Sequence, residues 1–200
     1  RRRTPVARHG IDGGAKNAAL PIMAATLLCD EPVTLQNVPH LNDVTTMEKV
    51  LQALGARTKW LDRGTLCVDC GAGVKEEAPY ELVKAMRASF FVMGPLLSRL
   101  RRARIPLPGG CAIGARPVNI HLKGFEALGA TVSIEGGCAV ALADKLVGAR
   151  IVLDFPSVGA TENLMMAATF AEGMTSIENA AQEPEIDDLA GFLNAMGARI

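Results

Sequence analysis

Two stretches of the chain, at about residues 16–29 and 160–172, are apolar at nearly every position. A helix on the surface of a globular protein has a polar stripe, whereas a helix that is apolar all round is buried. The pattern therefore predicts two helices that lie between other layers of the fold. A third helix with a mainly apolar sequence is predicted at 80–100.

Three further helices are predicted from a short phrase, Ala-Leu-Gly-Ala or Ala-Met-Gly-Ala, that occurs three times. Its glycines are Gly55, Gly129 and Gly197. Glycine is favoured just past the last turn of a helix because it adopts a positive φ without strain. We expect each glycine to end a helix, and the three helices then cover roughly 43–54, 117–128 and 184–196.

Short runs of strand-forming residues separate the two kinds of helix, at Val33–Val38, Arg104–Pro108 and Thr175–Asn179. Alternating runs follow the first two glycine-ended helices, at Arg57–Leu61 and Thr131–Glu135. A unit of helix, strand, helix and one or two strands thus occurs three times, and the third unit is incomplete. This order predicts an α/β fold with partly parallel sheets. The alternative is that a short glycine phrase recurs by chance at helix ends.

Composition narrows the class of protein. Hydrophobic residues make up 49% of the 200 residues, and 21 basic residues balance 21 acidic ones. A neutral chain argues against broad binding to nucleic acid or to a membrane surface, but it leaves room for a local anion site. No apolar run reaches the roughly 18 residues of a membrane span, and the start lacks the apolar segment of a signal peptide. The five irregularly spaced cysteines fit free thiols, so we expect a cytoplasmic protein.

The loop before the first apolar helix has the composition of an anion site. Gly13 and Gly14 precede the helix, and Lys16 and Asn17 open it. Unpaired amides at a helix start bind anions, and the lysine adds a positive charge. The alternative is a flexible loop with a solvated lysine. Arg87, in the third apolar helix, is costly to bury unless it meets an anion; otherwise it lies at the surface in a salt bridge.

Cys111 is predicted to lie in a loop, because the prolines and glycines around it exclude a regular helix or strand. Arg116 follows five residues later and is a cation that can lower the pKa of the thiol. Pro117 suits the first position of the next helix, which leaves the amides before it free for a ligand. The alternative is an incidental loop thiol.

The second fully apolar helix begins at a turn of small residues, Ser157, Val158 and Gly159. This turn is another candidate site for an anion or a hydroxyl group. The alternative is a plain helix start in which Thr161 is the capping residue.

Cysteine and histidine patterns do not predict a metal site. Cys67 and Cys70 have the spacing of a ligand pair, but on a strand they face opposite sides, and the chain has no second such pair. His9, His40 and His121 are scattered without ligand spacing.

Five motifs, in order from about Gly14 to Ile200, together resemble one family. They are G-G-A-K-N-A-A-L-P, A-P-Y-E-L-V-K-A-M-R-A-S, L-P-G-G-C-A-I-G-A-R-P-V, S-V-G-A-T-E-N and E-N-A-A-Q-E-P-E-I. The chain is similar to the UDP-N-acetylglucosamine (UDP-GlcNAc) enolpyruvyl transferases, which are also called 1-carboxyvinyltransferases. The cysteine loop separates this family from its relative in the shikimate pathway.

The resemblance implies an enolpyruvyl transferase-type fold, an inside-out α/β barrel. Each of its two domains has three βαβαββ repeats, with helices inside and sheets outside. Residues 13–200 then form one such domain whose third repeat is incomplete, and residues 1–12 match poorly. The implied reaction transfers the enolpyruvyl group of phosphoenolpyruvate to the 3′-hydroxyl of UDP-GlcNAc and releases phosphate. This step begins peptidoglycan synthesis, and it needs no metal and no organic cofactor.

The resemblance also implies roles for individual residues. Cys111 is expected to donate a proton to the methylene carbon and to react with fosfomycin-type inhibitors. Lys16 and Asn17 are expected to contact phosphoenolpyruvate and the sugar substrate, while Arg87 and Arg116 bind their anionic groups. The uridine nucleotide is expected to lie against Arg116, Pro117, Val118, Asn119, Ile120, Ser157, Val158 and Gly159.

The chain departs from the family in three residues and in length. Phe155 stands where many members have lysine, Asn119 replaces a common aspartate, and Gly13 replaces a common serine. Members are much longer, and their second domain, the expected partner of this one, supplies the general base. The alternative function is therefore a catalytically incomplete chain that only binds nucleotide sugar, because a half-site does not close over its substrates.

Overall fold

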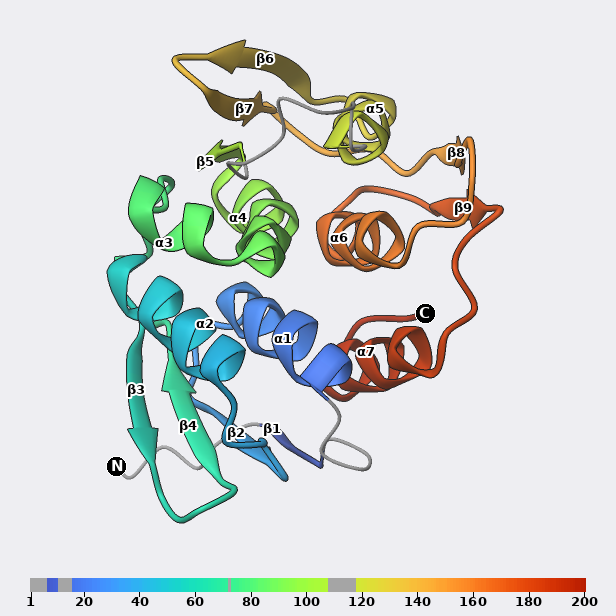
Figure 1. The fold of residues 1–200 in the computed structure, drawn as a ribbon. Coiled ribbons are helices and arrows are strands. Elements are labelled where there is room, and N and C mark those ends of the chain that lie inside the picture. Colours follow the sequence, from blue (N-terminus) through green and yellow to red (C-terminus); the bar gives the residue numbers. More distant parts are fainter. Residues whose placement is uncertain (1–6, 11–15, 72, 108–117) are drawn as a thin grey trace.

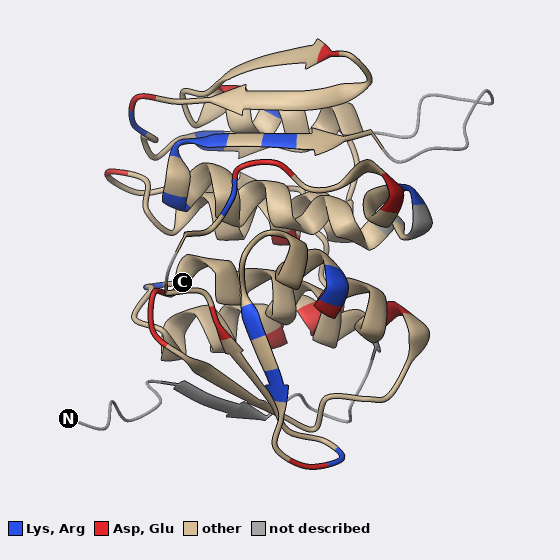
Figure 2. Cartoon of the chain, turned by 90° about the vertical axis from the view of Figure 1, so that its left-hand side faces the viewer, with Lys and Arg blue, Asp and Glu red and all other residues tan. Residues whose placement is uncertain are grey.

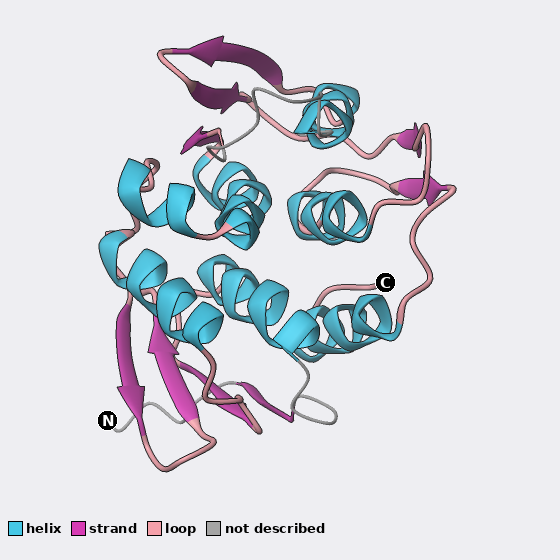
Figure 3. Ribbon diagram, in the orientation of Figure 1, coloured by secondary structure: helices cyan, strands magenta, loops and turns pink. Residues whose placement is uncertain are grey.

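The computed structural model describes residues 7–10, 16–71, 73–107 and 118–200. Helices lie in the middle of the molecule, and three small sheets lie around them (Figure 1). The view coloured by secondary structure shows the strands at the periphery, with each sheet on a different side of the helices (Figure 3). The α/β class predicted from the sequence is confirmed.

The first sheet has the strand order β1-β2-β4-β3. Strands β1 and β2 are parallel, whereas β4 is antiparallel to both β2 and β3. In β4 the burial alternates along the strand, so one face of the sheet packs on the helices. The elements are β1 (Ala7–Gly10), α1 (Lys16–Ala25), η2 (Thr26–Leu28), β2 (Val33–Gln36), α2 (Asn42–Ala53), β3 (Arg57–Trp60) and β4 (Leu66–Asp69).

The second sheet, β5-β7-β6, is antiparallel throughout. An isolated parallel bridge joins Glu77 to Arg104, so the segment before α3 lies beside β5 much as β1 lies beside β2. The elements are α3 (Tyr80–Ala85), η3 (Arg87–Val92), α4 (Met93–Leu100), β5 (Arg102–Pro106), α5 (Val118–Ala127), β6 (Thr131–Glu135) and β7 (Cys138–Leu142).

The prediction of one continuous helix over 80–100 is wrong. The backbone is extended at Met86, with φ −145° and ψ 118°, and a 3₁₀ helix then leads into α4 at Met93. Pro95 accounts for this second boundary because it has no N–H to donate and clashes with the carbonyl four residues earlier in a continuous helix. In the observed arrangement Pro95 falls in the first turn of α4, where proline is tolerated.

The third sheet consists of two parallel strands, β8 (Arg150–Val152) and β9 (Ser176–Glu178). Between them the chain passes through α6 (Val158–Ala168), and after β9 it enters α7 (Pro184–Ala195). The Arg150 guanidinium donates two hydrogen bonds to the Glu178 carboxylate across the strands, at 2.5 and 2.8 Å. The helices predicted at 160–172 and 184–196 are thus confirmed, although the first begins two residues and ends four residues earlier than predicted.

The three glycine-ended helices close in the same way. Gly55, Gly129 and Gly197 have φ values of 102°, 94° and 105°, so each takes the left-handed conformation that glycine favours. In each case the amide after the glycine bonds a carbonyl five residues earlier in a Schellman motif. The pairs are Ala56 with Leu51, Ala130 with Phe125 and Ala198 with Leu193, at 2.9, 3.0 and 3.0 Å. The predicted helix ends are confirmed.

The core lies where the helices meet. Residues 18–25 of α1 and 160–167 of α6 are all buried, which confirms that both helices lie between other layers. The buried part of α6 includes polar residues, among them Glu162 and Asn163.

In the described part of the chain no helix is long and apolar enough to cross a membrane. Basic and acidic residues are interspersed on the face that Figure 2 shows.

Candidate functional site

Helices α4 and α6 run in the same direction. The side-chain oxygen of Asn163, in the middle of α6, accepts a hydrogen bond of 2.6 Å from the amide of Gly94, near the start of α4. Further along both helices, the hydroxyl groups of Ser98 and Thr169 are 3.3 Å apart. The start of α4 therefore lies at the same end of the molecule as the start of α6.

Helices α5 and α1 share this direction. His121, near the start of α5, lies beside Gly159, near the start of α6, and Gly124 further along α5 packs on the Leu164 side chain further along α6. Arg99, at the end of α4, donates to the carbonyls of Leu27 and Cys29, which follow α1. The helices α1, α4, α5 and α6 thus begin at a common end, where the positive ends of their dipoles gather. The first amides of α4 are already bonded, Met93 to the Phe90 carbonyl and Gly94 to Asn163.

Most of the residues predicted to bind substrate lie at this common end. Lys16 and Asn17 begin α1, and Arg87 begins η3, directly before α4. The Asn17 side chain is exposed; the side chains of Lys16 and Arg87 lie outside the described part of the structure. Val118, Asn119 and Ile120 form the first turn of α5, and Ser157, Val158 and Gly159 form the start of α6. Cys111, Arg116 and Pro117 lie outside the described residues.

Ser157 is the capping residue of α6. Its hydroxyl accepts from the Ala160 amide at 3.4 Å, and its backbone is extended, with φ −134° and ψ 113°. The alternative prediction that Thr161 caps this helix is wrong. Thr161 lies inside the helix, where its hydroxyl donates to the Ser157 carbonyl at 2.8 Å and accepts from the Ala181 amide at 3.1 Å. These bonds fix the turn that opens α6 and tie it to the segment before α7.

His121 and Asn163 form a buried polar connection between α5, η3 and α6 that the sequence analysis missed. The Asn163 amide nitrogen lies 3.1 Å from the Phe90 carbonyl and 3.1 Å from His121 Nδ1. The imidazole packs edge-on against the Phe90 ring, with ring centroids 5.2 Å apart. Burial lowers the pKa of His121 to about 4, so the ring is neutral at physiological pH. No spacing in the sequence pointed to this pair, since the two residues are far apart along the chain.

Glu162, the neighbour of Asn163, is a second buried polar group that the sequence analysis missed. It is 1% exposed, and neither carboxyl oxygen has a hydrogen-bond partner among the described residues. Burial raises the pKa of Glu162 to about 9, and the carboxylates of Glu185 and Glu183 near the start of α7 raise it further. Glu162 is therefore a neutral carboxylic acid at pH 7.

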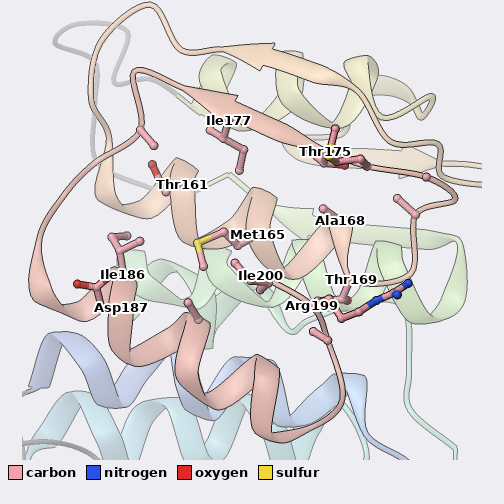
Figure 4. A pocket seen from close by; sticks show the side chains of 16 residues that line it. Thr161, Met165, Ala168, Thr169, Thr175, Ile177, Ile186, Asp187, Arg199 and Ile200 are labelled. Carbon is pink, nitrogen blue, oxygen red and sulfur yellow. The ribbon is translucent and has the colours of Figure 1, made fainter.

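A cavity of about 600 Å³ lies between α6, β9 and α7 (Figure 4). Met165, Ile177 and Ile186 line it from these three elements. The cavity extends along α6 to Thr169, near the end of that helix, so much of it lies away from the common helix end. It lies beside the two-stranded sheet.

The cysteines in the described part of the chain do not form a reactive cluster. Cys67 is half-buried on β4, and Cys70 is buried directly after this strand. Burial raises the pKa of the Cys70 thiol to about 11, so this thiol stays protonated at physiological pH. Among residues 7–10, 16–71, 73–107 and 118–200, no group of His, Cys, Asp and Glu residues is arranged to hold a metal ion.

Residues 8–200 match the EPSP synthase (3-phosphoshikimate 1-carboxyvinyltransferase) family, and the chain belongs to this family. The match covers all of the helices and sheets described above apart from the first residue of β1. The class of protein is therefore that of the enolpyruvyl (carboxyvinyl) transferases.

Within this class the chain is similar to UDP-N-acetylglucosamine 1-carboxyvinyltransferases. The enzyme of this name from Gloeobacter violaceus is 59% identical over 187 residues, which are 94% of this chain and 41% of the relative. UDP-N-acetylglucosamine 1-carboxyvinyltransferase 2 from Carboxydothermus hydrogenoformans is 60% identical over 187 residues, which are 94% of this chain and 44% of the relative. The chain spans less than half the length of these relatives.

Solved structures with the same fold have low sequence identity. The enolpyruvyl transferase NikO from Streptomyces tendae matches 97% of this chain and 45% of its own, with a TM-score of 0.80 and 22% identity. An EPSP synthase from Acinetobacter baumannii matches 90% of this chain and 42% of its own, with a TM-score of 0.66 and 15% identity. These likenesses establish the enolpyruvyl transferase-type fold of the chain.

Proposed function

We propose that the chain is the N-terminal half of an enzyme that transfers the enolpyruvyl group of phosphoenolpyruvate to the 3′-hydroxyl of UDP-GlcNAc. One observation carries the proposal: predicted substrate-binding stretches begin α1, α5 and α6 at one common end, and Arg87 begins η3, which leads into α4. Free amides and helix dipoles at such an end favour anions, and both substrates carry phosphate groups. Relatives that are 59–60% identical have the name of this enzyme, which supports the choice of substrates.

In this proposal Cys111 donates a proton to the methylene carbon of phosphoenolpyruvate, which becomes a methyl group. The sugar hydroxyl gives its proton to the general base of the second domain, and its oxygen bonds to the adjacent carbon. Loss of phosphate and of one proton from the methyl group then restores the double bond. Lys16 and Asn17 contact phosphoenolpyruvate and the sugar, and Arg87 and Arg116 hold anionic groups. The stretches Arg116–Ile120 and Ser157–Gly159 hold the uridine nucleotide. The reaction would belong to peptidoglycan synthesis in the cytoplasm, and it uses no metal or organic cofactor.

The release of phosphate tests this function. The longer protein, with the second half that the relatives have, is expected to release phosphate when both UDP-GlcNAc and phosphoenolpyruvate are present. Cys111→Ala and prior alkylation by fosfomycin are both expected to lower this release, because each removes the proton-donating thiol. Cys67→Ala, on β4 of the first sheet, is the matched control and should leave the rate unchanged. Absence of phosphate release from the unmodified longer protein would contradict the proposal.

Binding and phosphate-release measurements distinguish two other functions from the proposed one. The first is a chain that only binds nucleotide sugar. Binding of UDP-GlcNAc without turnover by the 200-residue chain, measured by isothermal titration and by phosphate release, would support this function for the isolated chain. The shikimate-pathway reaction is disfavoured by the Cys111 loop. Phosphate release with shikimate 3-phosphate in place of UDP-GlcNAc would overturn that choice.

We also propose that residues 13–200 form one domain of three βαβαββ repeats in an inside-out barrel. In the first two sheets, the strand β2 or β5 pairs with an antiparallel strand, β4 or β7, that returns after a glycine-ended helix. Strand β9 has the equivalent position in the third sheet, and β8 is its one described partner. The cavity beside β9 and α7 is where the last two strands of this repeat would lie.

Hydrogen exchange tests the repeat proposal. A chain extended beyond Ile200 by the following segment is expected to exchange the amides of β9 at least about tenfold more slowly than the 200-residue chain, because a new strand would bond to its free edge. The amides of β2, which already lies between β1 and β4, serve as the internal control. Equal rates for β9 in the two chains would contradict the proposal.

A further inference from the structure

One arginine joins the segment after α1 to the segment after β4. The Arg99 guanidinium, near the end of α4, donates through one nitrogen to the carbonyls of Leu27 and Cys29, at 2.8 and 3.0 Å. Its other terminal nitrogen donates to the Cys70 carbonyl at 3.0 Å. Cys29 directly follows η2, and Cys70 directly follows β4. A single planar group therefore holds together the backbones of two cysteines that are far apart in the chain.

The two segments are also in direct contact. Gly71 follows Cys70, and a Cβ at Gly71 would lie 2.7 Å from the carbonyl oxygen of Asp30, which follows Cys29. A disulfide spans only about 4.4–6.8 Å between its two Cα atoms, so it forms between backbone segments that touch. The segments at Cys29 and Cys70 are close enough to satisfy this requirement.

Both thiols lie against the core. Cys70 is 1% exposed, whereas Cys29 is half-buried and packs on the core from its edge. Burial raises the pKa of the Cys70 thiol to about 11, and the nearby Cys29 thiol makes a smaller contribution in the same direction. The two sulfurs are therefore within electrostatic reach of each other. Cys67 differs from both, because it lies on the outer face of β4.

We propose that Cys29 and Cys70 form a disulfide site, which is closed by a low-molecular-weight disulfide such as oxidised glutathione. The Cys29 thiolate, from the more exposed residue, attacks one sulfur of the small disulfide. The S–S bond breaks, and one small thiol leaves with the proton that Cys29 lost. The Cys70 thiolate then attacks the Cys29 sulfur of the mixed disulfide, and the second small thiol leaves with the Cys70 proton. Two protein thiols are oxidised, and one small disulfide is reduced to two thiols.

The bond would stabilise the first sheet without taking part in the proposed reaction. Cys29 follows α1 and η2, and Arg99 lies near the end of α4, so the pair lies away from the end where the candidate binding stretches begin. The inference is therefore independent of the proposed function. Because Cys70 stays protonated at physiological pH, the pair is not reactive by itself, and the second step is slow. Once closed, the bond restricts the unfolded chain between residues 29 and 70.

Peptide mapping of the Cys111→Ala chain tests this site, because the substitution removes the loop thiol that would compete for the oxidant. After incubation with oxidised glutathione at about pH 8.5 and alkylation of the remaining thiols, mass spectrometry is expected to find the peptides of Cys29 and Cys70 joined. The Tm of the oxidised chain is expected to lie about 5–10 °C above that of the same chain after reduction. Cys67→Ala in this background is the matched control and should form the same bond.

Two further variants separate the two steps. Cys29→Ala should leave Cys70 free and the Tm unchanged by the oxidant, whereas Cys70→Ala should keep glutathione attached to Cys29. Mapping of the wild-type chain gives a result that does not depend on the folding of any variant. A persistent glutathione adduct on Cys29 beside a free Cys70, or a bond from either cysteine to Cys67, would overturn the inference. A joined pair without a rise in Tm would overturn the stabilising role.

Discussion

Replacement of Glu162 by glutamine is expected to stabilise the chain above about pH 5, by an amount that grows as the pH rises. Glu162 is buried without a hydrogen-bond partner in the described structure, and two acidic residues at the start of α7 disfavour its ionised form. Glutamine has nearly the same shape as the protonated acid and cannot ionise. The variant therefore keeps the packing of α6 against α7 and removes the cost of deprotonation.

The sign of this effect follows from the two pKa values. The pKa of Glu162 is about 9 in the folded chain, against an ordinary value of 4.5. Between these values the folded state holds a proton that the unfolded state releases, so rising pH favours unfolding by up to about 1.4 kcal/mol per pH unit. Below pH 4.5 Glu162 does not lower the free energy of unfolding, because it is protonated in both states. As the pH rises from 4.5 toward 9, the free energy of unfolding decreases. At pH 7.5, three units above the ordinary pKa, the glutamine variant should gain on the order of 4 kcal/mol.

Urea unfolding between pH 5.5 and 9 measures this difference. The curves of stability against pH for the wild type and Glu162→Gln should diverge steadily over this range. The matched control is Glu126→Gln on the exposed face of α5, which should follow the wild type at every pH. Parallel curves for Glu162→Gln and the wild type would show that the Glu162 carboxyl is solvated or paired in solution.

His121 has the opposite dependence on pH. Burial lowers the pKa of His121 from 6.5 to about 4. Its contribution to stability is therefore fully present above pH 6.5 and is lost as the pH falls from 6.5 to about 4. In the Glu162→Gln variant we expect stability to rise from pH 4 to 6.5 and then to level off, because the opposing titration of Glu162 has been removed.

Gly94→Ala is expected to destabilise the chain by about 3–5 kcal/mol. A Cβ at this position would overlap the backbone and side-chain oxygens of Asn163, so α4 and α6 would have to move apart. Overpacking of a core usually costs about 1–3 kcal/mol. The separation would also break the hydrogen bond between the Gly94 amide and Asn163, and a buried polar group left unsatisfied costs about 1–3 kcal/mol more.

Thermal unfolding checks this prediction. For a chain of this size the expected loss lowers the Tm by about 10 °C. Gly64→Ala is the matched control, because the nearest atom to a Cβ there is the Asn37 Cα at 3.9 Å, an ordinary contact. If Gly94→Ala and Gly64→Ala melt within a degree or two of each other, the close contact between α4 and α6 is not present in solution.

Helix ends were the most predictable part of the fold. Gly55, Gly129 and Gly197 ended the expected helices, since a Schellman motif depends on a local backbone conformation that glycine supplies by itself. The break near residue 86 was missed. Pro95 was a local signal for the start of α4 and could have been used, whereas nothing in the sequence around Met86 explains its extended backbone.

The candidate site was predictable only where its residues form contiguous stretches. Asn17, the first turn of α5 and the Ser157 turn lie at helix starts because capping and proline or glycine signals are local. His121 was set aside for lack of ligand spacing. Its partner Asn163 lies 42 positions away along the chain, and no periodicity relates residues on two different helices.

The sequence by itself determined which segments become helices, where most of them end and in what order the candidate binding stretches occur, because these depend on neighbours within a few positions. Only the tertiary structure decided that four helices begin at one end, that Asn163 connects His121 of α5 to α4 and η3, and that Glu162 is a neutral acid. These features depend on the direction in which the helices pack and on loss of water from side chains. Both are set by contacts between segments that are distant in the chain.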